Sequence, residues 1–256
     1  MHARRLTYQA MTVLVVVGVL ELLTISGVFS AKSFPRITDD VGELASVLRD
    51  RVFWQGVGET LRGWALGLGL ATLVALPLGL LIGMNQWIRS ATTAIIEFLR
   101  PIPSVALIPL AVLVLGTGLQ SKVFLTAFAA MWPILIGTVY GVRDVDPVVL
   151  DTARSFHIRR SDQLRTILLP GALPYVATGF RVASATALIL AVTAELVIGM
   201  PGLGQQITLA QASNQVPLMY GLIIATGVLG LLINMVIVRA ERHVLRWHSS
   251  YRKVTT

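Results

Sequence analysis

The stretch YVATGFRVASATALILAVTAELVIG, residues 175–199, decides the fold, because it runs for 25 residues with only two charged side chains, Arg181 and Glu195. A helix that crosses the hydrocarbon core of a bilayer needs about 20 mostly apolar residues, and apolar runs of this length seldom have another explanation. We therefore predict that this stretch is a membrane-spanning helix.

Five further apolar runs extend this interpretation to most of the chain, and together they predict an all-α, polytopic membrane protein with six transmembrane helices. The other runs are Met11–Ser30, Gly63–Met84, Pro101–Leu119, Val123–Val142 and Met219–Val238. A cleavable signal peptide is the alternative for the first run. Its length and the lack of a small-x-small cleavage site before Lys32 favour a retained helix.

The run at Pro101–Leu119 is the least regular of the six. It begins with Arg100-Pro101-Ile102-Pro103, and two prolines so close together interrupt a regular helix. Proline is also common in the first turn of a helix, so the same residues are compatible with a simple helix start. The sequence leaves both interpretations open.

Composition and charge support the membrane class and suggest an orientation. Only 13% of the 256 residues are charged, about half the share of a soluble domain, and no cysteine is present to form a disulfide or a thiolate metal site. With both termini in the cytoplasm, the inward segments hold fourteen Lys and Arg residues and the outward segments hold six. The net charge of +8 thus reflects membrane topology and implies no nucleic-acid partner.

We divide the chain into residues 1–52, which hold the first transmembrane helix and an outer loop, and a membrane core over residues 53–256, which includes a loop at residues 143–174. Within the outer loop, Val41–Val52 is predicted to be an amphipathic helix on the membrane surface. Glycines four residues apart, Gly63 with Gly67 and Gly79 with Gly83, predict close helix packing. The small residues of 183–194 indicate either tight packing or a helix that lines a pathway or subunit interface.

The loop at residues 143–174 is predicted to be cytoplasmic and structured. Asp146 and Pro147 are suited to begin a helix over Val148–Phe156, with Val149, Ala153 and Phe156 on one face. Ser161 is expected to cap a second helix, Asp162–Leu169, that ends at Pro170. The chain contains no phosphate-binding P-loop, so this loop is expected to dock onto another protein and not to bind a nucleotide itself.

The same loop resembles a known signature. Residues 151–153 read Asp-Thr-Ala, His157 follows after three residues, and Ile-Leu-Leu-Pro at 167–170 follows after nine more. This resembles the Glu-Ala-Ala, Gly and Ile-x-Leu-Pro pattern in permeases of binding-protein-dependent ABC importers, from which Thr152 and His157 depart. The resemblance assigns ATPase coupling to Asp151, Thr152, Ala153, Ser155, Phe156, His157, Ile167, Leu169 and Pro170. Because histidine tolerates the left-handed region better than most residues, His157 is expected to preserve the turn.

The resemblance extends to Pro201-Gly202-Leu203-Gly204 after Glu195, and to the tail Glu241–Trp247, which is similar to that of taurine, aliphatic sulfonate and nitrate permeases. It implies the transmembrane domain of a type I ABC importer in the inner (plasma) membrane. The implied partners are ATP-binding-cassette ATPase subunits that carry ATP and Mg²⁺, a second permease copy in a homodimer, and an extracytoplasmic solute-binding protein. No cofactor is expected in this chain. The implied solute is small and anionic, with betaine, an amino acid or a pyrimidine precursor as alternatives.

Four polar residues of 175–199 are candidates for the translocation path: Ser184, Thr186, Thr193 and Glu195. Glu195 has a second interpretation, in which it pins the Gly202-Leu203-Gly204 turn by accepting hydrogen bonds from backbone amides. We favour the pin, since a carboxylate would repel an anionic solute. Arg181 is close enough to the inner interface to reach it with its side chain.

Catalytic and metal-binding classes find no support. The four histidines do not have metal-ligand spacing, and no serine has a nucleophile-elbow context. A secondary transporter working alone would need coupling carboxylates near the membrane midplane or inverted repeats. Glu21 is the only carboxylate that is predicted near a midplane. The favoured function is thus a transport subunit that is not itself an enzyme.

Overall fold

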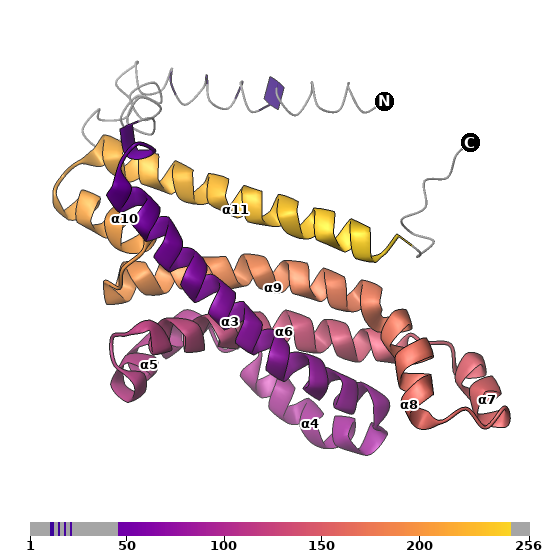
Figure 1. The fold of residues 1–256 in the computed structure, drawn as a ribbon. Coiled ribbons are helices and arrows are strands. Elements are labelled where there is room, and N and C mark those ends of the chain that lie inside the picture. Colours follow the sequence, from indigo (N-terminus) through magenta and orange to yellow (C-terminus); the bar gives the residue numbers. More distant parts are fainter. Residues whose placement is uncertain (1–10, 13–14, 16–17, 19–20, 22–45, 247–256) are drawn as a thin grey trace.

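The structure is a computed structural model that describes residues 11–12, 15, 18, 21 and 46–246, and every regular element of the described part is helical (Figure 1). Its elements are α3 (Arg51–Met84), α4 (Gln86–Leu99), η1 (Ser104–Leu107), α5 (Ile108–Leu115), α6 (Leu119–Arg143), α7 (Pro147–Ser155), α8 (Arg160–Gln163), η2 (Leu164–Leu168), α9 (Leu169–Ile198), α10 (Leu203–Ala212) and α11 (Val216–Val244).

The predicted first span and most of the outer loop lie outside the described residues. Positions 11, 12, 15, 18 and 21 of that span are helical. The predicted surface helix over Val41–Val52 is wrong at its end, because the chain turns at residues 48–49 and α3 begins at Arg51. Asp50 sets this start, since its Oδ1 accepts a hydrogen bond from the Val52 amide at 2.9 Å.

Four helices in the described part are long and apolar enough to cross a membrane: α3, α6, the continuous segment Arg160–Ile198 that includes α9, and α11. They confirm the predicted spans at Gly63–Met84, Val123–Val142, Tyr175–Gly199 and Met219–Val238. Each is longer than its apolar run, because helices continue past the bilayer core until a cap or a turn ends them.

The third predicted span, Pro101–Leu119, is wrong as a single helix, because it contains only the short elements η1 and α5 before α6 begins at Leu119. The pair α4 and η1–α5 together has the composition of a span but is bent by 83°. The break falls at Pro101-Ile102-Pro103, where proline removes backbone donors and restricts the residue before it. Of the two interpretations of these prolines, the interruption of a regular helix therefore describes this segment, and the simple helix start does not.

Close approach of α3 to α6 follows from the two glycine pairs. A Cβ at Gly67 would lie 2.5 Å from Thr126 Cβ, and one at Gly79 would lie 2.6 Å from Thr138 Cβ, which is closer than two carbon atoms can approach. The four glycine contacts on α6, in chain order from Gly63 to Gly83, are Lys122, Thr126, Thr138 and Val142. Because both series ascend together, α3 and α6 run parallel, and the bent segment between them must return across the bundle.

The packing of α9 on α6 is antiparallel and equally close. A Cβ atom at Gly137 would lie 2.8 Å from the Tyr175 carbonyl oxygen, and one at Gly141 would lie 2.8 Å from the Ala172 carbonyl oxygen. A Cβ atom at Gly179 would lie 2.5 Å from the Pro133 carbonyl oxygen. The C-terminal ends of α3, α6 and α11 point toward the same end of the bundle, where α7 and α8 lie (Figure 1). We call this the loop end, and the end that carries α10 the opposite end.

Replacing Gly67 tests the glycine packing. We expect Gly67→Ala to lower the free energy of unfolding by about 1–3 kcal/mol, because the added methyl group overlaps Thr126. Gly69→Ala in the same helix is the matched control, since no atom lies within 4 Å of the new Cβ. It should be neutral or stabilise the helix by up to about 1 kcal/mol. Equal unfolding midpoints for both variants in detergent would contradict the packing described above.

Candidate functional site

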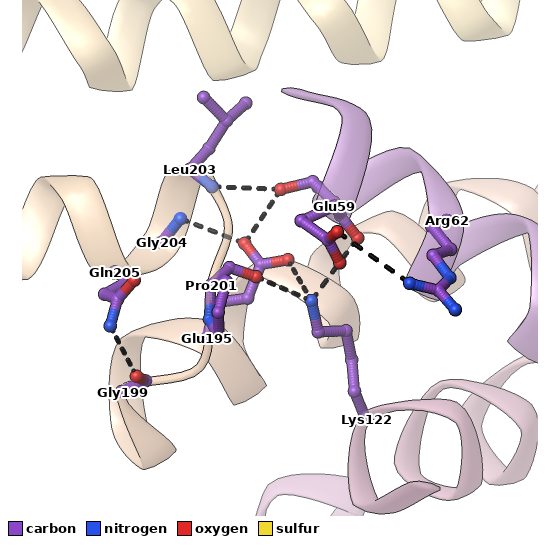
Figure 2. A network of polar contacts seen from close by, with 10 residues as sticks. Glu59, Arg62, Lys122, Glu195, Gly199, Pro201, Leu203, Gly204 and Gln205 are labelled. Atoms are coloured by element: carbon purple, nitrogen blue, oxygen red, sulfur yellow. Dashed lines mark hydrogen bonds and ion pairs between the residues drawn. The ribbon is translucent and has the colours of Figure 1, made fainter. Parts of the chain in front are cut away.

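A buried ion pair joins three helices near the opposite end of the bundle. Lys122 Nζ on α6 lies 2.9 Å from Glu195 Oε1 on α9, and their side chains are 3% and 0% exposed (Figure 2). Thr60 on α3 donates a hydrogen bond to Glu195 Oε2 at 2.9 Å. Charges that are buried in this way are tolerated only when their remaining hydrogen-bonding capacity is satisfied.

The same pair holds the turn between α9 and α10. Gly204 N donates to Glu195 Oε2 at 3.0 Å, Lys122 Nζ donates to the Pro201 carbonyl at 2.9 Å, and Leu203 N donates to Thr60 Oγ1 at 3.0 Å (Figure 2). Gly202 is required here for two reasons. Its φ of 155° is a backbone conformation that favours glycine, and a Cβ would overlap the Glu195 carboxyl group.

Glu195 therefore has the geometry of the pin and not that of a path-lining residue. The sequence does not point to a role for Lys122, because this lysine lies between two apolar runs and counts only as one of the six outward Lys and Arg residues. The available signal was Gly63, the first member of a glycine pair, which leaves room for the lysine stem where α3 meets α6.

The four residues predicted to line a path do not share a surface. Ser184 and Glu195 are buried on the side of α9 that meets α3, where Trp64 Nε1 donates to the Ser184 carbonyl at 3.1 Å. Thr186 and Thr193 lie on the opposite, partly exposed side, and each donates a hydrogen bond to its own helix backbone. Ser184 and Glu195 are thus corrected to packing residues in this conformation, and Thr186 and Thr193 stay candidates.

Arg181 has a closer partner than the membrane interface. Its Nη1 lies 3.5 Å from Glu241 Oε2, so the side chain bridges α9 to α11. The sequence placed both residues near the same membrane surface but gave no reason to pair them.

The loop end carries the predicted docking element. Asp146 caps α7 by accepting a hydrogen bond from the Val148 amide at 2.8 Å, which confirms the predicted helix start. Ala153 is buried against the rest of the protein, whereas Phe156 is 77% exposed and Val148 and Val149 are exposed. The predicted apolar face is therefore divided: one small residue anchors α7, and large apolar side chains point outward.

His157 occupies the left-handed turn that was expected of it, with φ of 54°. Amide hydrogen bonds from His157 to the Arg154 carbonyl (2.9 Å) and from Ile158 to the Ala153 carbonyl (3.0 Å) close α7. Asp151 and Arg154 form an exposed ion pair at 2.9 Å on the outer surface of the helix.

The second half of the loop differs from the prediction. Ser161 does not cap a helix, since α8 begins at Arg160 after Arg159. Pro170 does not end one either, because α8, η2 and α9 form one continuous helical segment. The π turn over Leu164–Leu168 accounts for this, as its wider hydrogen-bond spacing relieves the conflict between a proline ring and the preceding turn.

The helical bundle, the bent third span and the docking loop together define a polytopic membrane transport subunit. The model of the family described as "Binding-protein-dependent transport system inner membrane component" matches residues 75–248, and the chain belongs to this family. It is accordingly the permease subunit of an ABC importer, which transports a solute and is not an enzyme.

Individual relatives agree with this assignment. The chain is 31% identical over 196 residues to the bicarbonate transport system permease protein CmpB of Synechococcus elongatus, covering 76% of this chain and 70% of the relative. It is 30% identical over 199 residues to the taurine transport system permease protein TauC of Escherichia coli, covering 78% and 72%. The nitrate import permease protein NrtB of Synechocystis is 32% identical over 181 residues, covering 71% and 66%.

Solved structures support the fold. The inward-facing MetNI methionine ABC transporter contains a chain that matches with a TM-score of 0.66 at 22% identity, covering 75% of this chain and 96% of that one.

Removing the cation from the buried pair should be strongly destabilising. Lys122→Met leaves the Glu195 carboxylate buried without a counter-charge, and we expect a loss of about 3–5 kcal/mol in unfolding free energy. Arg62→Met is the control, because its partner Glu59 lies 3.8 Å away and both side chains are exposed. That variant should lose less than about 1 kcal/mol. Thermal unfolding of the purified variants measures both, and similar losses would argue against a structural role for the buried pair.

Proposed function

We propose that the exposed face of α7 docks into an ATP-binding-cassette ATPase, and that this contact drives the import of a small solute. The exposed Phe156 at the end of α7, together with the exposed Val148 and Val149 at its start, is the observation that carries the proposal. Large apolar side chains grouped at the end of a bundle, beyond its apolar spans, are costly in water and are typical of protein contacts.

The coupling residues have distinct roles in this proposal. Ala153 anchors α7 to the permease, His157 turns the chain, and Phe156 enters the ATPase. Asp151, Thr152 and Ser155 lie on the same short helix, while Ile167, Leu169 and Pro170 belong to the continuous segment that leads into α9.

Continuity between α8, η2 and α9 supports mechanical coupling. A displacement of α8 would be transmitted directly along α9, since Arg160–Ile198 is one continuous helical segment, and α7 is joined to α8 by a turn of only four residues, 156–159. At the same end, the Tyr175 hydroxyl donates to Asp144 Oδ2 at 2.7 Å, so α6 would move with α9. ATP binding on the partner would then shift the bundle between inward-open and outward-open states.

The proposed assembly places the loop end and both termini in the cytoplasm. Two copies of this chain form the path as a homodimer, two ATPase subunits carry ATP and Mg²⁺, and a binding protein delivers solute to the opposite end. The excess of Lys and Arg in the segments assigned to the cytoplasm supports this orientation.

The proposed solute is a small molecule with an oxyanion group. Three relatives are named for the transport of bicarbonate, taurine and nitrate. Each of these solutes contains an oxyanion group, which is carboxylate-like, a sulfonate or a nitrate. Screening ligands for thermal stabilisation of the partner binding protein would identify the solute.

The docking assignment is tested by co-purification with the ATPase subunit. Phe156→Asp changes a side chain that is exposed in the permease, so it should leave the fold intact. It should reduce ATPase recovery at least about tenfold, because a charge replaces the apolar side chain that would be buried in the contact with the ATPase. Ala153→Arg should also reduce ATPase recovery, because the larger side chain displaces α7. Leu209→Asp, an equivalent exposed change on α10, is the control and should retain normal recovery. Intact assembly and intact ATP-dependent uptake in both α7 variants would rule the assignment out.

A further inference from the structure

Helix α4 has two contrasting faces along its whole length. Arg89, Thr93, Glu97 and Arg100 follow one another at intervals of four, four and three residues, so they lie in one stripe. The other side presents Trp87 and Phe98, which are 84% and 73% exposed, together with Ile95. A helix of this kind lies between an apolar and a polar environment.

The polar stripe lines a groove. This groove has a volume of about 270 Å³ and lies between α4 and the second half of α6, which contributes Tyr140 and Arg143. A volume of this size accommodates a few water molecules or a small solute, but not a folded polypeptide segment.

The groove carries an excess of positive charge. Three arginines, Arg89, Arg100 and Arg143, line it together with a single acidic residue, Glu97. Arg89 donates a hydrogen bond to the Gly83 carbonyl at 3.1 Å. Within the described part of the chain, neither Arg100 nor Arg143 has an acidic partner within 4.0 Å, so their donors remain available.

The position of α4 indicates that the groove faces water and not lipid. The helix starts beside the end of α3, and Ile96 and Leu99 of its second half pack against the central apolar cluster, while no residue of α4 is fully buried. Charged side chains are costly in hydrocarbon and are found facing water, so the charged stripe is expected to face an aqueous space. The exposed Trp87, Ile95 and Phe98 already provide the apolar surface that lipid would contact.

We propose that the groove between α4 and α6 is an oxyanion-binding site on the translocation path, with Arg100 and Arg143 as its principal ligands. The proposal rests on the proposed import function and deepens it by naming residues that would recognise the solute in the loop-end half of the bundle. Guanidinium groups bind planar or tetrahedral oxyanions through paired hydrogen bonds, which a single ammonium group does not reproduce.

Glu97 is expected to lower the affinity of the site for anions. Its carboxylate repels an anion and offsets part of the attraction of the arginines, so the site binds weakly. Weak binding suits a path, because a solute that is held tightly does not leave.

The test uses the full-length permease in nanodiscs of phosphatidylcholine, without the ATPase, so that failure of docking cannot affect the result. Methanesulfonate and nitrate are the probes, and the shift in thermal unfolding midpoint with probe concentration gives the dissociation constant. We expect Arg100→Gln and Arg143→Gln each to weaken binding about tenfold, the loss typical of one charge-assisted contact. Glu97→Gln should tighten it about threefold, a change opposite to that expected from lost packing.

The control is Arg62→Gln, which removes an exposed arginine from the outer part of α3, far along the chain from the groove, and should leave probe binding unchanged. A parallel series in phosphatidylglycerol nanodiscs distinguishes the source of the oxyanion. Stabilisation by that lipid alone, lost in the arginine variants, would support the site but assign it to a phospholipid headgroup. Probe binding that is absent, or that is equal in wild type, Arg100→Gln and Glu97→Gln, would overturn the proposal while leaving ATPase docking unaffected.

Discussion

The close contact between α3 and α6 is the constraint on which the rest of the structure depends. Lipid supplies no hydrophobic driving force for the association of helices. The two helices associate because glycines at the interface allow their backbones to pack closely. Because the contact is parallel, the chain must recross the bundle between these helices. The bent α4–α5 segment performs this crossing, and its bend at Pro101 and Pro103 separates the polar groove from the more apolar α5.

The buried ion pair is a consequence of the same contact. The Lys122 stem occupies the space left by Gly63, and its ammonium group reaches Glu195 between α3 and α9. A buried ion pair contributes little net stability compared with apolar packing, but an incomplete one is costly. The pair therefore specifies one arrangement of α3, α6, α9 and the α10 turn. This leaves the opposite end of the bundle well defined, while the loop end carries the surface proposed for coupling.

The proposed coupling surface and the proposed oxyanion groove lie on different helices. The docking element continues into α9, whereas the arginine groove lies between α4 and α6. The two are connected because α6 packs closely on both α9 and α3. A displacement of α9 at the loop end would therefore alter the width of the groove, which relates ATP-driven movement to the release of a weakly held solute.

The sequence by itself determined the membrane class, four of the spans, the start of α7 and the turn at His157, since these depend on local composition, capping and backbone preference. It also determined the family, through the spacing of the docking loop. Only the tertiary structure decided that Lys122 is buried, that Ser184 and Glu195 face α3, and that Pro170 lies inside a continuous helix. The burial of Lys122, Ser184 and Glu195 depends on which helix faces which, and that is set by contacts between residues far apart in the chain. The continuous helix through Pro170 depends instead on the π turn over Leu164–Leu168.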